Sequence, residues 1–320
     1  MNKTFWLLVC MAWASLSQKA MAVAADVSCT VTRLDGEVIL LGYPSKSPTG
    51  LPPHYRMGGK YYAYQKAHVG DQVALHNLVK TQKGAAVRLI FNYGDLIEVG
   101  ENTTLRFDKK KVGLKVLPVI HLDSGSIRVA VKNGGVLSDM GFKSPIGDIR
   151  IDGTEFYMQV DKKGKTFVAV LRGAVKVLPY GKGAARERRI PEKKALMLVP
   201  GGEAVGPYFL TRKEVLGIQS KTYVSNRALQ IPSLSKQKYI NELEAEAFDS
   251  IMEDLLAKKP HLYNQFASDK KRWRNIDALL GFTIEKIAFS IKPGGQKAAG
   301  GKGEKEGFKP LNTIYPGDKE

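Results

Sequence analysis

The chain has 320 residues, of which 43% are hydrophobic and 25% are charged. This balance is ordinary for a globular protein and excludes a wholly disordered or collagen-like chain. Lysine and arginine outnumber aspartate and glutamate by 49 to 31, and the formal net charge of +18 favours anionic partners. Two cysteines are too few for a disulfide framework or a cysteine-rich metal site.

The first 22 residues have the pattern of a secretory signal peptide. One lysine precedes the apolar run Thr4–Leu16, and the small-residue step Ala20-Met21-Ala22 follows. The run is too short for a membrane-spanning helix, which needs about 20 apolar residues. We therefore expect cleavage near Ala22 and a periplasmic or secreted mature chain without a transmembrane span. Cys10 would leave with the signal peptide, so Cys29 would be the single remaining thiol.

Residues 27–206 are expected to form a β domain. Short alternating segments such as 127–131 and 167–171 are separated by turns that contain glycine and aspartate. Short strands of period two, broken by turns about every 8–12 residues, are typical of an all-β sandwich, barrel or coil. Within the strand 127–131 the alternation places Arg128 on the outward face.

An insertion at residues 42–67 interrupts this pattern. It is rich in tyrosine, proline and glycine and has no acidic residue. Its tyrosines are Tyr43, Tyr55, Tyr61, Tyr62 and Tyr64. Tyrosine offers a large amphipathic surface at low entropic cost and is enriched at interfaces. We expect a recognition surface that is dispensable for folding; the alternative is that the tyrosines pack on the β domain and close one end of its core.

From residue 207 to residue 291 the apolar period becomes helical. Two stripes with spacings of three and four are Ile240, Leu243, Ala247, Ile251 and Leu255, and then Trp273, Ile276, Leu280, Ile284, Ile287 and Ile291. We expect an antiparallel helical hairpin, which either pads the β domain or serves as an accessory or oligomerising element. Residues 292–320 are rich in glycine and lysine and are expected to form a disordered tail.

Several short motifs of the β region occur in a characteristic order. They are Leu34-Asp35-Gly36-Glu37-Val38, Val69-Gly70-Asp71-Gln72-Val73, Leu122-Asp123-Ser124-Gly125, Ser144-Pro145-Ile146-Gly147, Gly153-Thr154-Glu155-Phe156 and Leu171-Arg172-Gly173-Ala174-Val175. In this order they resemble the FecR domain, the extracytoplasmic domain of a family best known for iron-signalling regulators. The resemblance runs from about Val31 to Pro200 and implies a β-solenoid-like or rolled-sheet fold, no catalytic centre, and a sensing or protein-docking role.

The motif residues are expected to be structural. Glycines at the turns permit positive φ or close backbone approach, and Phe156 would enter the core while Thr154 bonds locally. The structural set is Gly70, Asp71, Gly125, Pro145, Gly147, Gly153, Thr154, Phe156 and Gly173. Regulators of the family carry a cytoplasmic anti-sigma segment before one membrane span, whereas only Met1–Lys3 precedes the apolar run here. We therefore expect a stand-alone envelope module.

No catalytic or metal-binding constellation is expected. Asp123-Ser124-Gly125 resembles an aspartic-protease loop, but such enzymes need a second loop of the same kind to pair their carboxylates. His68 and His76 lack the spacing and companions of a metal site, and Cys29 has no histidine near it. Motifs for serine hydrolases, P-loop enzymes and zinc proteases do not occur. We expect no enzymatic activity, no metal and no cofactor.

A basic run is the second candidate binding feature. Its residues are Arg186, Arg188, Arg189, Lys193 and Lys194. They suit an anionic glycan or lipid headgroup, or else form solvated hairpin loops; nucleic acid is disfavoured because few aromatic residues lie among the charges.

These features favour a non-enzymatic, exported binding or sensing module that docks a protein partner or an anionic envelope polymer. The alternatives are a structural protein associated with peptidoglycan or the outer membrane, and a hydrolase. The oligomeric state stays open.

Overall fold

The computed structural model describes most of the chain between residues 28 and 291. The described ranges are 28–48, 53–92, 94–112, 115–132, 137, 140–181, 186–201, 203–224, 233–269 and 274–291. The predicted signal peptide, the predicted tail and Trp273 lie outside them.

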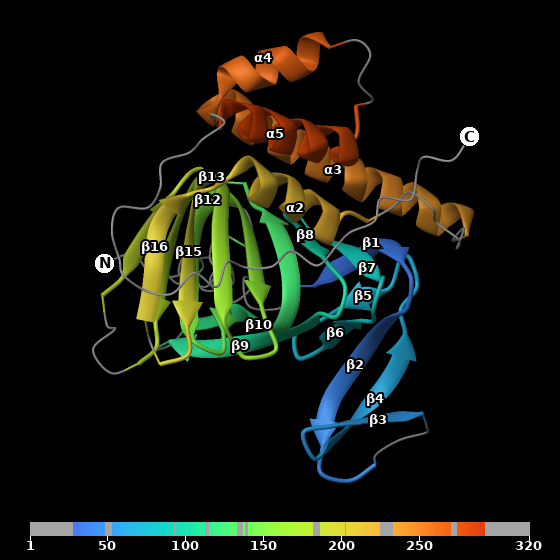
Figure 1. The fold of residues 1–320 in the computed structure, drawn as a ribbon. Coiled ribbons are helices and arrows are strands. Elements are labelled where there is room, and N and C mark those ends of the chain that lie inside the picture. Colours follow the sequence, from blue (N-terminus) through green and yellow to red (C-terminus); the bar gives the residue numbers. More distant parts are fainter. Residues whose placement is uncertain are drawn as a thin grey trace, which may run out of the picture.

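Sixteen strands form one curled sheet (Figure 1). The first eight are β1 Cys29–Asp35, β2 Val38–Ser45, β3 His54–Met57, β4 Lys60–Lys66, β5 Gln72–Val73, β6 Leu78–Thr81, β7 Ala86–Phe91 and β8 Leu96–Val99. The others are β9 Thr104–Val112, β10 Lys115–Ala130, β11 Gly141–Ser144, β12 Gly147–Val160, β13 Thr166–Pro179, β14 Arg188–Pro191, β15 Lys194–Val199 and β16 Glu203–Phe209.

The main path of the sheet is β16-β15-β13-β12-β11-β10-β9-β6-β2-β4-β3, with β1, β5, β7, β8 and β14 joined beside it. Strands β10 and β11 pair in parallel, and the other pairings among the described strands are antiparallel. The expected mainly β fold followed by helices is therefore confirmed, and the narrower solenoid description stays a prediction.

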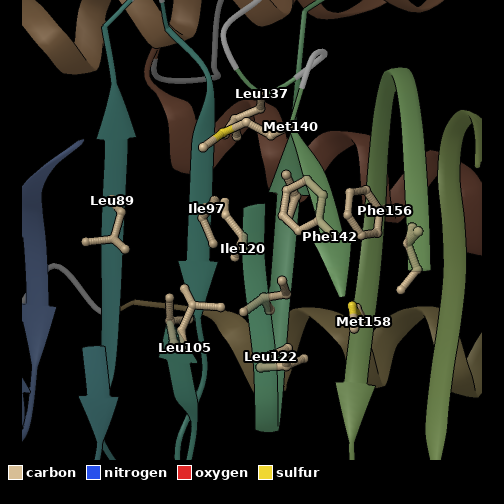
Figure 2. Packing of buried hydrophobic residues seen from close by; sticks show 14 of the residues in the cluster. Leu89, Ile97, Leu105, Ile120, Leu122, Leu137, Met140, Phe142, Phe156 and Met158 are labelled. Carbon is tan, nitrogen blue, oxygen red and sulfur yellow. The ribbon is translucent and has the colours of Figure 1, made fainter. Parts of the chain in front are cut away.

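The largest apolar core lies inside the curl of the sheet. Alternate residues of β9, β10, β11 and β12 point into it, including Ile120, Leu122 and Met158 (Figure 2). The rings of Phe142 and Phe156 meet edge to face with their centroids 5.1 Å apart. The strands therefore show the predicted alternation on their inner side.

Strand β12 changes its alternation at Gly153. The register against β13 shifts between Asp152 and Glu155, and Gly153 has a φ of +50°. Before this bulge Ile151 faces the core, and after it Phe156 does. Because side chains alternate along a strand, an odd-to-even change of this kind requires an extra residue. The bulge thus turns Phe156 inward and Glu155 outward.

The described part of the chain has four helices after the sheet, which are α2 Arg212–Thr222, α3 Leu234–Lys258, α4 Pro260–Ser268 and α5 Ile276–Ser290. Three of them, α2, α3 and α5, cover part of the outer surface of the sheet, while α4 lies above α5 (Figure 1). The predicted stripe on α3 is buried and packs with α5 against Ile90, Leu96 and Ala130. Helices α2 and α5 pack against Tyr157 and neighbouring residues of β13 and β15. The expectation of C-terminal helices is confirmed, but two predicted helices have become four: α2 and α4 are additional, and α4 starts at Pro260 because proline suits the first helical turn.

The tyrosine-rich insertion is largely built from strands. Strands β3 and β4 form a hairpin, and β4 pairs with β2, so that the three strands project from the body as an arm (Figure 1). Gly58 and Gly59 join β3 to β4 with φ values of +56° and +74°. A type I′ turn has positive φ at both central residues, and it is one of the turns that commonly close a two-residue β-hairpin loop.

Replacing Gly153 with valine should destabilise the fold. A β-branched residue at a φ of +50° is strained by roughly 1–3 kcal/mol, a large share of a typical total stability of about 5–15 kcal/mol. Thermal unfolding measures the loss. Gly141→Val on β11 is the matched control, because a Cβ at Gly141 meets no atom within 4 Å. Equal midpoints for the two variants would contradict a structural role for the bulge.

Candidate functional site

A ladder of alternating buried charges crosses the outer face of the sheet. Arg88 on β7 lies opposite Glu98 on β8, and Glu98 lies opposite Arg128 on β10. The ladder continues through Glu155 on β12 to its cross-strand partner Arg172 on β13. All five side chains are at most 4% exposed. Each strand thus contributes one charge, and the signs alternate from strand to strand.

Two contacts within the ladder are hydrogen bonds, and the other two, Glu98 with Arg128 and Glu155 with Arg172, are ion pairs at 3.8 Å. Arg88 donates to Glu98 at 2.7 Å, and the Arg128 Nε donates to Glu155 at 3.0 Å. A second guanidinium nitrogen of Arg128 donates to the backbone carbonyl of Leu280 on α5 at 3.0 Å. The ladder is therefore bonded to the helical layer as well as along the sheet.

The helices supply the remaining carboxylates. Glu244 on α3 and Asp277 on α5 lie 3.1 and 2.5 Å from the guanidinium of Arg88. Both also pair with Arg33 on β1. Burial alone would raise the pKa of Asp277, but Arg88 and Arg33 outweigh it and hold that pKa below its ordinary value. At the other end of the ladder Asp254 on α3 bonds to Arg172.

Lys258 completes the network at the end of α3. Its ammonium lies 3.0 Å from Asp254 and donates to the backbone carbonyl of Gly153 at 2.5 Å. Four arginines and this lysine thus face five carboxylates. A buried charge is tolerated only with such partners, so the network fixes where the helices sit on the sheet.

A buried carboxylate also holds the turn between β7 and β8. Asp95 is fully buried and accepts hydrogen bonds from the backbone nitrogens of Lys132 at 3.1 Å and Leu137 at 2.7 Å. Burial raises its pKa from 3.8 to about 6, against the opposing effect of these hydrogen bonds. The turn itself touches α3, because a Cβ at Gly94 would lie 2.9 Å from the carbonyl oxygen of Glu246.

The five predicted tyrosines do not form one surface. Tyr62 is buried with Ile39, Leu41 and Leu78, and Tyr55 and Tyr64 pack on the same cluster. Tyr61 directly precedes Tyr62 on β4, and successive side chains of a strand point to opposite faces, so Tyr61 faces the other side of the arm. There Arg56 lies 5.7 Å from its ring centroid. Tyr43 is 66% exposed and stacks on His76 at 4.8 Å.

The predicted basic residues also separate into two groups. Arg186, Arg188 and Arg189 are exposed on or just before β14. Lys193 is half-buried in the turn before β15, and Lys194 is half-buried as the first residue of β15, where it lies 4.5 Å from the ring centroid of Phe209. Strand β14 pairs with β13, which lies seven strands from β4 along the sheet path. The basic run and the tyrosines therefore lie on different parts of the sheet.

The motif residues have structural surroundings. A Cβ at Gly125 would lie 2.4 Å from the Cα of Thr103, and one at Gly173 would lie 2.9 Å from the carbonyl oxygen of Gly153. Thr154 donates to the carbonyl of Ala174 at 2.8 Å. Gly70 has a φ of +92°, and a Cβ at Gly147 would lie 2.8 Å from the side chain of Leu198. Asp71 accepts a hydrogen bond from the backbone nitrogen of His68 at 2.9 Å. Pro145 is exposed in the turn before β12.

Other candidate groups have ordinary environments. Asp123 pairs with Arg106 at 3.3 Å on the surface. Cys29 is buried, and burial raises the pKa of its thiol. No group of three or more metal-binding side chains occurs among the described residues. Within the same residues, no helix is long and apolar enough to span a membrane.

The charge ladder was not predicted from the sequence. The alternation of 127–131 predicted an outward Arg128, and the structure shows that α5 covers this outward face and buries the side chain. A usable signal was present, because Arg88, Glu98 and Arg128 each stand between apolar residues in short strands. Charged residues in such positions are rarely fully buried unless paired.

Comparison with known proteins supports one resemblance. Residues 77–176 match the model of the FecR family, described as FecR protein. The resemblance inferred from the motifs is therefore confirmed for this part of the chain. Two crystal structures of a putative anti-sigma factor from Parabacteroides distasonis ATCC 8503 match with 12% identity and a TM-score of 0.35, covering 43% of this chain and 62% and 63% of theirs. No curated protein matches.

Asp254→Leu should destabilise the protein by about 3–5 kcal/mol, because buried Arg172 then loses its hydrogen-bonded carboxylate and keeps only the more distant Glu155 at 3.8 Å. Asp249→Leu on the same helix removes the same charge from an exposed position and should change stability by less than about 0.5 kcal/mol. Urea denaturation measures both. A small effect of Asp254→Leu would mean that the ladder does not hold the helices.

Asp95 should make stability depend on pH in a defined direction. Its folded pKa is raised, so the folded state binds the proton more strongly, and the stability contributed by Asp95 falls as pH rises from about 4 to about 6. Asp95→Asn should remove this component of the slope. Unfolding curves of wild type and variant between these pH values test it, and parallel curves would contradict the assignment.

Proposed function

We propose that this chain is a non-enzymatic, exported sensing and docking module that binds a protein partner through the arm formed by β2, β3 and β4. The FecR match at residues 77–176 supports the sensing role. The signal-peptide pattern of the first 22 residues supports export. The helical layer serves as a fixed accessory of the β domain.

The tyrosine-bearing face of the arm carries the proposal. Tyr55 and Tyr64 are half-buried and flank Tyr62, so their rings present amphipathic surface above a small apolar cluster. Tyrosines in this state are common anchors at interfaces, because the ring is buried by a partner while the hydroxyl bonds to it. The hydroxyl of Tyr55 accepts a hydrogen bond from Lys80, whose ammonium lies 4.8 Å from the ring centroid, so Tyr55 offers a partner mainly its ring.

The arm also ends in an edge strand. Strand β3 is the last strand of the sheet path and pairs with β4 on one side. An edge strand offers unpaired backbone groups to which a partner strand can bond. The alternating side chains of β3 include Tyr55 and Met57 on the face that packs on the cluster. A strand added to β3 would therefore meet both backbone donors and a tyrosine surface.

Each alternative function predicts a different experimental result. A structural protein of the envelope would hold peptidoglycan or an outer-membrane partner and would sediment with purified cell wall. A hydrolase would need a catalytic centre, and the loop at Asp123 is the segment that resembles one. The arm proposal instead requires one defined protein partner.

The double variant Tyr55→Ala/Tyr64→Ala should weaken partner capture at least about tenfold, or about 1.4 kcal/mol. Capture from envelope extract, followed by titration of the isolated partner, measures this loss. Tyr223→Ala is the matched control, since Tyr223 is 49% exposed at the end of α2. Thermal midpoints of all variants are recorded in parallel. A collapsed midpoint with unchanged capture would show that these tyrosines only complete the fold.

A further inference from the structure

We propose that one end of the helical layer attaches the protein to the surface of a bilayer with anionic headgroups. The site consists of Phe209 at the end of β16, Arg212, Lys213 and Leu216 on α2, and Phe289 on α5. We call these five residues the membrane patch. The two phenylalanines are each 64% exposed, and the leucine is 43% exposed. The arm is not part of this site, so the inference does not rest on the proposed docking partner.

Strand β16 and two helices bring the membrane patch together. The guanidinium carbon of Arg212 lies 4.5 Å from the ring centroid of Phe289. Leu216 follows Arg212 by four residues, and residues at this spacing are neighbours on one side of a helix. Phe209 precedes Arg212 by three residues, which limits the distance between their Cα atoms to about 11 Å. Apolar side chains and cations therefore lie next to each other in one small area.

The exposure of the two rings has structural causes. Tyr208 packs against the apolar cluster beneath α2, and successive side chains of a strand point to opposite faces, so Phe209 faces away from that cluster. On α5, the ring of Phe282 is covered by Phe266 of α4, with the ring centroids 5.3 Å apart. Phe289 lies on the same side of α5 two turns later and is exposed. Large apolar side chains that gather on a surface commonly mark a contact with a protein or a membrane.

Cations surround the two exposed rings. Arg212 and Lys213 are exposed on α2. Lys194 on β15 is paired with Phe209, and its ammonium lies 4.5 Å from the ring centroid. Lys286 is half-buried on α5, one turn before the exposed phenylalanine of that helix. The patch and its border thus carry four positive charges.

The described carboxylates near the membrane patch do not cancel these charges. Glu214 is the one acid of α2, where it is half-buried and accepts a hydrogen bond from the N-cap backbone nitrogen at 2.7 Å. Glu285 on α5 is half-buried. Glu192 pairs with Lys259 at 3.0 Å, and Glu203 lies at the other end of β16. Four cations and the two carboxylates of Glu214 and Glu285 leave a surplus of two positive charges.

This combination suits a bilayer better than a protein or a nucleic acid. Phenylalanine and leucine enter the boundary between headgroups and acyl chains, while lysine and arginine extend their charged ends to the headgroups. Lysine, in contrast, is depleted at protein interfaces. Single-stranded nucleic acid binds a groove that tracks its backbone, with aromatic side chains that stack successive bases. The apolar area is small, so we expect reversible binding that weakens as salt screens the headgroups.

The position of the membrane patch leaves the arm available. Strand β16 stands at one end of the sheet path and β3 at the other. Figure 1 shows β16 and the arm on opposite sides of the molecule. A protein attached through the patch therefore holds the arm at a distance from the bilayer.

The first test is co-sedimentation with vesicles of phosphatidylcholine and phosphatidylglycerol in equal parts. The chain used lacks the predicted signal peptide at residues 1–22, which would bind lipid by itself. Phe209→Ser/Phe289→Ser should weaken binding at least about tenfold, because the apolar anchors are lost. The control Leu234→Ser/Tyr239→Ser replaces two exposed apolar residues at the start of α3, where that helix contacts Gly70, and should stay within about twofold.

The same assay tests the role of charge. Arg212→Gln/Lys213→Gln should weaken binding to the anionic vesicles at least about threefold. The control Lys162→Gln/Lys163→Gln removes the same charge from exposed positions in the turn between β12 and β13 and should leave binding unchanged. Vesicles of phosphatidylcholine alone should bind wild type at least about tenfold more weakly.

A second measurement reports insertion directly. Phe289→Trp keeps a large aromatic ring in the patch, and its additional emission should shift to shorter wavelength when anionic vesicles are added. Brominated lipid should quench that emission. Thermal midpoints of all variants should equal that of wild type, since the replaced side chains are exposed.

Four outcomes overturn the proposal. They are absence of wild-type binding to anionic vesicles, equal losses in the patch variants and their controls, and an emission of Phe289→Trp that vesicles do not change. The fourth is tighter binding of an envelope protein or of single-stranded DNA through the same residues. The tryptophan variant decides the matter even if Phe209→Ser/Phe289→Ser lowers the thermal midpoint.

Discussion

The buried charge ladder is the constraint that the rest of this structure depends on. Five strands place Arg88, Glu98, Arg128, Glu155 and Arg172 in a line on the outer face of the sheet. These charges would be solvated if this face of the sheet were exposed to water, but helices bury them. Burying charged side chains is favourable only when the helices supply oppositely charged partners. The position of the helices is therefore determined by electrostatics as much as by apolar contact.

Helix α3 illustrates this determination. Glu244 and Asp254 lie ten residues apart, or about 15 Å along the helix axis. They bind Arg88 on β7 and Arg172 on β13, which are separated by four strand spacings through β8, β10 and β12, or about 19 Å. The long arginine side chains cover the difference. The helix must therefore cross the strands, since both contacts fail if it runs along them.

Much of this fold was predictable from local patterns, and the parts that were not depend on distant partners. The alternation of 127–131 and the helical stripe from Ile240 to Leu255 follow from nearest neighbours, and both appear in the structure. The network around the ladder joins residues as far apart as Arg88 and Asp277. Local sequence patterns carry no information on contacts between residues so far apart in the chain. The sequence therefore predicted that Arg128 faces outward, but not that α5 packs over it.

The tyrosines show a second limit of local patterns. Composition identified the segment, but the assignment of each ring to a face depends on the register of β3 and β4. Gly58 and Gly59 set that register by forming the turn, and they make Tyr55 the partner of Tyr62. Tyr61 then falls on the opposite face by alternation. The strand pairing that forms the arm also buries Tyr62. The tyrosine surface is therefore smaller than the whole segment 42–67 that composition identified.

The FecR motif and the helical layer meet at one backbone position. The bulge at Gly153 turns Phe156 into the core and Glu155 toward Arg128 and Arg172. Without the shift of register, an outward Glu155 and an inward Ile151 could not coexist on β12. Lys258 at the end of α3 then bonds to the carbonyl of Gly153 itself. A single glycine thus supports the core of the domain, the centre of the charge ladder and the end of the covering helix. Helix α3 is therefore in direct contact with this bulge, and the helical layer has a physical connection to the motif Gly153-Thr154-Glu155-Phe156.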